Sequence, residues 1–179
     1  MNPGGQAVNR ESGGQAVNRE SGLLRRGRGR AANLAAVLTC AALAWLTMIL
    51  AAPLALSRAR GPVFTLAVYQ AGSLVCHQRP ERSFRLAGMQ LPVCARCFGL
   101  YLSGAVGLTV ATRSRRALSA RAARMLLAVT ALPIVTTVAL EWLGAIETTN
   151  VQRLLTALPL GFAAGVVIVR SLQGRGDAL

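Results

Sequence analysis

The sequence lacks lysine and has few acidic or aromatic residues. All 20 basic residues are arginine, against 6 acidic residues and one histidine, and aromatics make up 4% of the chain. We attribute the absence of lysine to base composition rather than to function. A net charge of +14 is typical of nucleic-acid-binding proteins. The arginines, however, lie just outside apolar blocks, where the topology signals of membrane proteins lie. We therefore predict no nucleic-acid partner.

Long apolar blocks account for most of the chain, and 53% of its residues are hydrophobic. Blocks of this length are typical of membrane spans rather than of a soluble core. We predict an all-α polytopic membrane protein whose main partner is the lipid bilayer. Its four spanning helices are expected at about 33–56, 97–112, 125–143 and 154–169. The apolar segment 62–75 is short for a span, so we expect an interfacial or re-entrant helix there.

Small residues recur at a spacing of four in two of the expected spans. In the second span they are Gly99, Ser103 and Gly107, and in the fourth they are Gly161 and Gly165. This spacing lets helix backbones approach closely in lipid. Glycine is also simply common in membrane helices, and we weigh the two interpretations equally.

The N-terminal region contains a duplicated nonapeptide, GGQAVNRES, at 4–12 and again at 13–21. The repeat is polar and cannot bury a core. We predict a disordered basic tail over 1–32, a transmembrane helical domain over 33–170 and a short C-terminal tail over 171–179. A cleaved signal peptide is the alternative for the first apolar run. That run exceeds a typical signal core of roughly 7–15 residues, so we expect an uncleaved anchor.

The distribution of arginine predicts the orientation. With four spans, 13 arginines fall on the side of both termini and 7 on the other side. Because basic loops stay inside, we expect the protein in the cytoplasmic membrane with both termini cytoplasmic. Residues 57–96 and 144–153 are then extracytoplasmic. If 62–75 also crossed the membrane, the split would fall to 11 against 9, and we favour four spans for this reason.

Three of the four cysteines and the only histidine fall within 22 residues. Cys94 and Cys97 form a CxxC, which lets two sulfurs converge on one metal ion or on each other. Cys76 and His77 complete a Cys₃His set, which suits one transition metal ion, with zinc favoured. Adjacent ligands such as these two are less usual than ligands two to four apart. Cys40 lies in the middle of the first span, and we interpret it as a packed apolar residue.

Two alternatives to a metal site remain open. The CxxC begins a predicted helix, and the helix N-terminus and Arg96 should lower a thiol pKa, which suits a thiol–disulfide redox protein with Cys76 resolving. The absence of thioredoxin-like strand–helix alternation counts against this activity. In an oxidising compartment, a loop disulfide would instead brace a structural membrane subunit that assembles with itself or with another membrane protein. Phe98 follows the CxxC where c-type haem attachment needs histidine, so we expect no such haem.

Polar residues near the membrane complete the predicted site. Glu141 lies near the outer end of the third span, and an intramembrane carboxylate indicates function by default. We favour a pairing of Glu141 with arginine that ties the outer loops together over proton chemistry. A basic outer pocket for an anionic lipid or a small anion is a weaker alternative. The supporting polar residues that we expect are Gln78, Arg82, Ser83, Arg96, Glu141, Asn150 and Arg153.

The strings CHQRPERSF at 76–84 and PVCARCFGLY at 92–101 resemble the signature of an uncharacterised family of small predicted bacterial and archaeal membrane proteins, known only as a domain of unknown function. That signature is CHQxPxRSF followed by PVCxRCxGxY. A later Asn-x-x-Arg with spaced glycines, at Asn150, Arg153, Gly161 and Gly165, is similar but less specific. The resemblance covers roughly 63–169. It implies several membrane helices and no particular activity. Phe98 departs from the small polar residue that is usual there.

Overall fold

The computed structural model describes residues 4–114 and 118–176, with side chains at 27 and 29–174 within those ranges. This part of the chain contains five α-helices, one 3-10 turn and one hairpin. The helices are α1 (Gly4–Ser57), α2 (Pro62–Ser73), α3 (Ala95–Arg113), α4 (Ala120–Trp142) and α5 (Asn150–Gly176). The 3-10 turn is η1 (Pro80–Arg82), and the hairpin consists of β1 (Arg85–Leu86) and β2 (Met89–Gln90).

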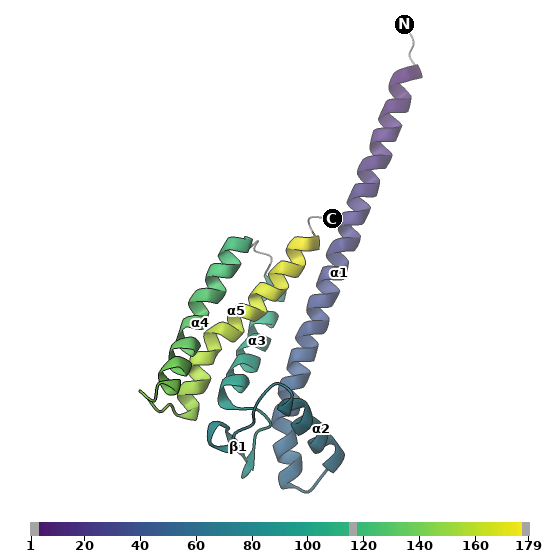
Figure 1. Cartoon of the computed structure of the whole chain (residues 1–179). Helices are drawn as coiled ribbons and strands as arrows, with labels where there is room; N and C mark the ends of the chain where they lie inside the picture. The colour runs from purple at the N-terminus through teal and green to yellow at the C-terminus, as the bar shows by residue number, and fades with distance from the viewer. Residues whose placement is uncertain (1–3, 115–117, 177–179) are drawn as a thin grey trace.

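The four long helices lie side by side and alternate in direction, as Figure 1 shows. α5 packs against α1, α3 and α4. The short elements α2, η1 and the hairpin gather at the end of the bundle where α1 finishes and α3 begins (Figure 1). We call this the loop end. The chain reverses between α3 and α4 at the opposite end, towards which α1 and α5 extend.

Three helical segments in the described part of the chain are long and apolar enough to cross a membrane. They are Gly29–Ser57, Ala120–Trp142 and Asn150–Gly174. Their outer surfaces expose large apolar side chains such as Leu132 and Val135, which is the arrangement that lipid requires. The predicted all-α membrane architecture is therefore confirmed. α3 is helical as expected but less apolar, so its place as a fourth span stays a prediction.

Of the two interpretations of the spaced small residues, close helix packing is the one that the structure supports where α3 meets α5. A Cβ atom on Gly99 would lie 2.7 Å from the carbonyl oxygen of Leu154. A Cβ on Gly107 would collide with the backbone of Phe162, and one on Gly165 would collide with the backbone of Gly104. The two backbones therefore touch along this interface, because no side chain separates them.

Two further expectations concern the short apolar segment 62–75 and the N-terminal tail. α2 has 12 residues, or about 18 Å of helix, which is too short to span a bilayer core of about 30 Å. α2 packs against α1 at the loop end, as an interfacial or re-entrant helix would. α1 already begins at Gly4, within the segment 1–32 for which a disordered tail stays a prediction. A helix that has formed a spanning segment extends without new nucleation, so the polar repeat can continue it. The boundaries of the membrane domain stay a prediction.

Candidate metal centre

A tight hairpin brings the two cysteine-bearing strings together. Arg85 pairs with Gln90 and Leu86 with Met89, and the turn residues Ala87 and Gly88 both have positive φ, of 51° and 80°. Positive φ at both central residues is the geometry of the two-residue turns that suit the natural twist of a hairpin. The strand after the turn therefore runs back along the segment that precedes it, and it delivers residues 91–94 beside residues 76–84.

Gln78 fastens these two segments to α2. Its side-chain amide donates to the carbonyl oxygens of Tyr69 and Pro92, both at 2.7 Å. Its own carbonyl accepts a hydrogen bond of 2.6 Å from the Gln90 side chain. Gln78 has a φ of 48°, which is unfavourable for a residue other than glycine. Such backbone strain persists only where surrounding contacts determine it, and these three hydrogen bonds are such contacts.

The end of α2 approaches the second string closely. A Cβ on Gly72 would collide with the carbonyl oxygen of Pro92 and would lie 2.8 Å from the Gln78 amide. The Gly72 carbonyl also accepts a 3.0 Å hydrogen bond from the backbone N–H of Cys76. Cys76 is thus held at the end of α2, against the segment that leads into the CxxC.

The three cysteines of the predicted site converge. Their sulfur atoms all lie within 4.8 Å of one another. Cys94 is the N-cap residue of α3, Cys97 lies in its first turn, and the backbone N–H of Cys94 donates to the Cys76 sulfur at 3.1 Å. All three thiols are free, with Cys76 buried and the other two half-buried. The prediction that the two strings meet at one place is confirmed for the cysteines.

His77 does not join this group. Its side chain is exposed, and the ligand atoms that converge in the described residues belong to the three cysteines alone. The structure thus brings together the three cysteines of the predicted Cys₃His set, and His77 as the fourth ligand stays a prediction. The backbone at residues 76–79 is neither helical nor hairpin, and neighbouring residues of a non-helical segment direct their side chains differently. His77 still lines the same pocket as the three sulfurs.

A hydrophobic layer underlies the cysteines. Ile49 of α1 and Val93 are fully buried against Cys76, with the CxxC packed on the same cluster. Phe98, the departure from the family signature, packs edge-on against Phe84 with ring centroids 6.3 Å apart. Phe98 therefore has a packing role in this layer.

The thiol environment at the start of α3 differs from the prediction in one respect. The pKa of Cys94 is lowered to about 5, chiefly by a hydrogen bond from the Cys97 thiol, while burial acts in the opposite direction. The backbone N–H groups of Arg96 and Cys97 add to the lowering, as expected at a helix N-terminus. The Arg96 guanidinium was expected to contribute as well. It pairs with Glu141 instead.

Glu141 joins three helices through two arginines. Its carboxylate oxygens lie 3.0 Å from Arg96 of α3 and 3.1 Å from Arg153 of α5, and these side chains are only 7%, 13% and 12% exposed. Thr148 also donates to this carboxylate. The predicted pairing of Glu141 with arginine is confirmed. It ties α4 to the helix that carries the CxxC.

Asn150 and Ser83 connect this ion-pair group to the first cysteine string. Arg153 donates to the Asn150 side-chain oxygen at 3.1 Å, and the Asn150 amide donates to the Ser83 carbonyl at 3.2 Å. Ser83 is buried and donates to the Arg79 carbonyl at 2.9 Å. Every predicted supporting residue therefore lies at the loop end. The roles of Tyr69 and Gln90 were missed, because they depend on how the hairpin folds.

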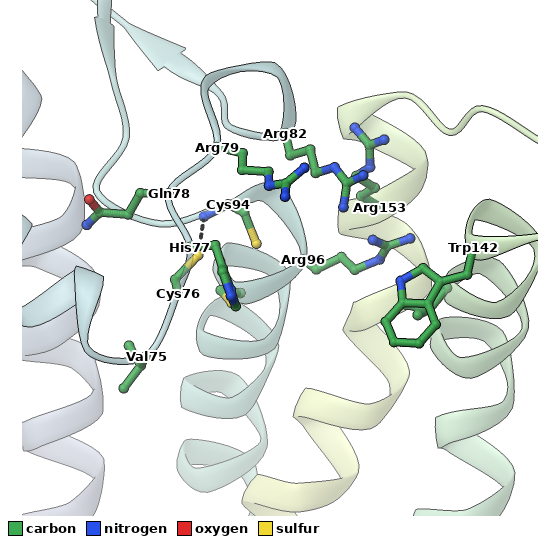
Figure 2. Close-up of a pocket in the computed structure, with 12 residues that line it drawn as sticks. Val75, Cys76, His77, Gln78, Arg79, Arg82, Cys94, Arg96, Trp142 and Arg153 are labelled. Carbon is green, nitrogen blue, oxygen red and sulfur yellow. Dashed lines mark hydrogen bonds between the residues drawn. The ribbon is translucent and has the colours of Figure 1, made fainter. Parts of the chain in front are cut away.

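A pocket of about 470 Å³ opens beside the cysteines (Figure 2). The guanidinium groups of Arg79, Arg82 and Arg153 gather on one side of the view, and Arg96 extends towards Trp142 (Figure 2). The pocket is lined by Val75, Cys76, His77, Gln78, Arg79, Arg82, Cys94, Arg96, Cys97, Val138, Trp142 and Arg153.

A comparison with known protein families identifies the family of this chain. Residues 76–167 match the model of a family described as "Predicted membrane protein (DUF2085)". The chain belongs to this family. The DUF2085 match begins at Cys76 and includes every residue of the predicted site. It confirms the resemblance, while the individual motif positions stay a prediction.

Two archaeal relatives extend the comparison. "Uncharacterized protein MJ1492" of Methanocaldococcus jannaschii is 46% identical over 46 residues, which are 26% of this chain and 30% of the relative. The chain therefore spans less than a third of that relative. An "Uncharacterized protein" of Methanothermobacter thermautotrophicus is 34% identical over 94 residues, which are 52% of this chain and 83% of the relative. No solved structure matches the chain.

Proposed function

We propose that this membrane protein binds one transition metal ion through Cys76, Cys94 and Cys97 at the loop end, with zinc favoured. The observation that carries the proposal is the convergence of three free thiols within 4.8 Å. Around a tetrahedral zinc ion with Zn–S bonds of about 2.3 Å, sulfurs stand about 3.8 Å apart. The cluster therefore needs only a small closure to bind the ion. Thiolates also favour soft or borderline metals over magnesium or calcium.

The fourth ligand that we propose is His77. Its imidazole lines the pocket beside the sulfurs and follows Cys76 directly in the chain. Because the side chain is exposed, it can turn without disturbing packed neighbours. A Cys₃His shell would be closed, as in structural zinc sites. His77→Ala should then weaken metal binding without abolishing it, whereas an unchanged affinity would assign the fourth position to another ligand.

Metal analysis combined with thiol counting on the purified chain tests the proposal. We expect about one metal ion per chain, with loss of that ion in Cys94→Ser. Cys40→Ser is the matched control, because Cys40 is exposed on α1 outside the cluster and should keep the metal. Metal-free protein that still has all four thiols intact would overturn the proposal. A disulfide found among these residues would favour a structural subunit.

A thiol–disulfide redox activity is the second candidate, supported by the lowered pKa of Cys94 and its contact with Cys97. In this activity the Cys94 thiolate would attack an acceptor disulfide and release one of its thiols, and Cys97 would then displace the mixed disulfide, which leaves a Cys94–Cys97 disulfide and the acceptor reduced to two thiols. Thiol trapping across a series of glutathione redox buffers should then give a reversible transition. Cysteines that stay in one state across the series would exclude it.

We further propose that the loop end is extracytoplasmic and that both termini are cytoplasmic. Support comes from the 13 arginines on the side of the termini against 7 on the loop-end side. A membrane-impermeant thiol reagent applied to intact cells tests this topology on the metal-stripped protein. Labelling of the cysteine cluster from outside is expected, and labelling only after lysis would reverse the orientation.

A further inference from the structure

The pocket beside the cysteines has a strong excess of positive charge. Four arginines line it, and its lining contains no carboxylate. Glu141 neutralises one positive charge of the Arg96–Arg153 pair. Arg79 and Glu81 lie 3.9 Å apart but are largely exposed, so this contact offsets little. Guanidinium groups held together in this way repel one another, and a bound anion would relieve the repulsion.

One buried guanidinium donor in the pocket has no partner among the described residues. The Arg96 Nε is buried without a hydrogen bond, whereas Nη2 of the same side chain is paired with Glu141 at 3.0 Å. Arg82 makes no ion pair within the part of the chain that the structure describes. Buried donors left unsatisfied are unfavourable, so a ligand oxygen in this pocket would stabilise them.

The shape of the lining narrows the class of ligand. Arginine matches the oxygens of carboxylates and phosphates through paired N–H donors. Arg82, Arg96 and Arg153 come from three different elements, so a tetrahedral group with several oxygens satisfies more of them than a planar carboxylate. Val138 and Trp142 of α4 add an apolar wall to the same pocket. Tryptophan is typical of the headgroup level of a bilayer, and Trp142 is 85% exposed.

We propose that this pocket binds a phosphate group, held by Arg82, Arg96 and Arg153 beside the cysteine cluster. The phosphate belongs either to an anionic lipid headgroup or to a free phosphate ion, and both present the same oxygens to the arginines. The site goes beyond the proposed metal binding and does not depend on it, because none of its three arginines is a metal ligand.

Binding to the purified full-length chain in a neutral detergent tests the proposal in two arms. Calorimetric titration with inorganic phosphate detects the free ion as ligand. Native mass spectrometry with phosphatidylglycerol, compared with phosphatidylcholine, detects a lipid headgroup. We expect saturable binding in at least one arm, and the arm that responds identifies the source. If phosphate does not bind and the two lipids bind equally, the proposal is wrong.

Two variants separate a specific site from general attraction to basic residues. Arg82→Gln should weaken binding by about tenfold, because it removes charge-assisted hydrogen bonds. Folding should survive, since the Arg82 side chain makes no ion pair among the described residues. Arg85→Gln is the matched control, since Arg85 is exposed on β1 at the same end but lies outside the pocket lining. Equal weakening by both variants would overturn the proposal.

The titrations are repeated after the metal has been removed with a chelator. Phosphate binding that persists in metal-stripped protein supports an independent arginine site, whether or not metal is found in the native protein. Binding that disappears with the metal would assign the anion to the metal ion rather than to the arginines, and would overturn the proposal as stated.

Discussion

α3 and α4 follow one another in the chain and have similar lengths, but they differ in how much of their surface is buried. α3 buries seven residues, most of them alanine, glycine or serine, against α1 and α5. α4 buries none, and its exposed face carries Met125, Val129, Leu132 and Val135. The more apolar helix is therefore the outer one. In a membrane the surroundings are as apolar as a core, so close backbone packing and polar pairing, rather than apolarity, mark the inside.

Polar pairing should contribute most to the attachment of α4. Glu141→Gln would leave the buried guanidinium groups of Arg96 and Arg153 without their carboxylate. We expect a loss of about 3–5 kcal/mol in the free energy of unfolding, measured by denaturant titration in detergent micelles. Glu147→Gln is the control, because Glu147 is exposed in the following loop. Equal stability of the two variants would show that the ion pairs do not hold α4 in place.

The backbone contact between α3 and α5 should make the next largest contribution to stability. Gly107→Ala would place a methyl group against the backbone of Phe162, which cannot move without displacing α5. We expect a loss of about 1–3 kcal/mol, seen as a lower midpoint of thermal unfolding. Gly104→Ala is a matched control, because its new Cβ would be 3.5 Å from the Gly161 carbonyl oxygen, an ordinary contact. If Gly104→Ala were as unstable, helix propensity or general crowding would explain both.

The loop end provides a third effect on stability, similar in size to that of the α3–α5 contact. Gln78→Gly removes the two hydrogen bonds to Tyr69 and Pro92 but tolerates the positive φ, so it isolates the side-chain contribution. We expect a loss of about 1–3 kcal/mol and weaker metal binding, measured together by thermal unfolding and competition with a chelator. Gln70→Ala, exposed on α2, should change neither. Normal metal affinity in Gln78→Gly would mean that the two strings meet without this residue.

The smallest effect is expected on the outer face. Leu132→Ala on α4 removes a side chain that is 59% exposed and should change stability by less than about 0.5 kcal/mol. Leu108→Ala on α3, at 7% exposure, should lower it by about 2–3 kcal/mol. Thermal unfolding of the two variants in one detergent makes the comparison directly. Similar losses would indicate that α4 is covered by a second copy or another subunit.

The helices were predictable because each depends on local pattern. Uninterrupted apolar runs predicted α1, α4 and α5, and the short run 62–75 predicted the helix found at Pro62–Ser73. The spacing of Gly161 and Gly165 indicated the close interface as well. The helical state of residues 4–32 was not predicted, because a polar repeat has no periodicity of its own.

Within the site, the sequence identified the participants better than their arrangement. Cys76, Cys94 and Cys97 were grouped correctly, and Glu141 was paired correctly with arginine. The absence of His77 from the group of converging ligand atoms was not predictable, because its position depends on the backbone that Gln78 fixes. Arg96 was assigned to the thiols through its neighbours in sequence, whereas a helix residue meets its partner through the face on which it lies.

Sequence alone determined a helical membrane protein with its reactive side chains near one end, because apolar length and residue chemistry are local properties. Only the tertiary structure decided which sulfurs meet, that α3 is enclosed while α4 faces outward, and that four arginines share one pocket. Those outcomes depend on a hairpin turn and on contacts between residues far apart in the chain, and no local pattern encodes such distances.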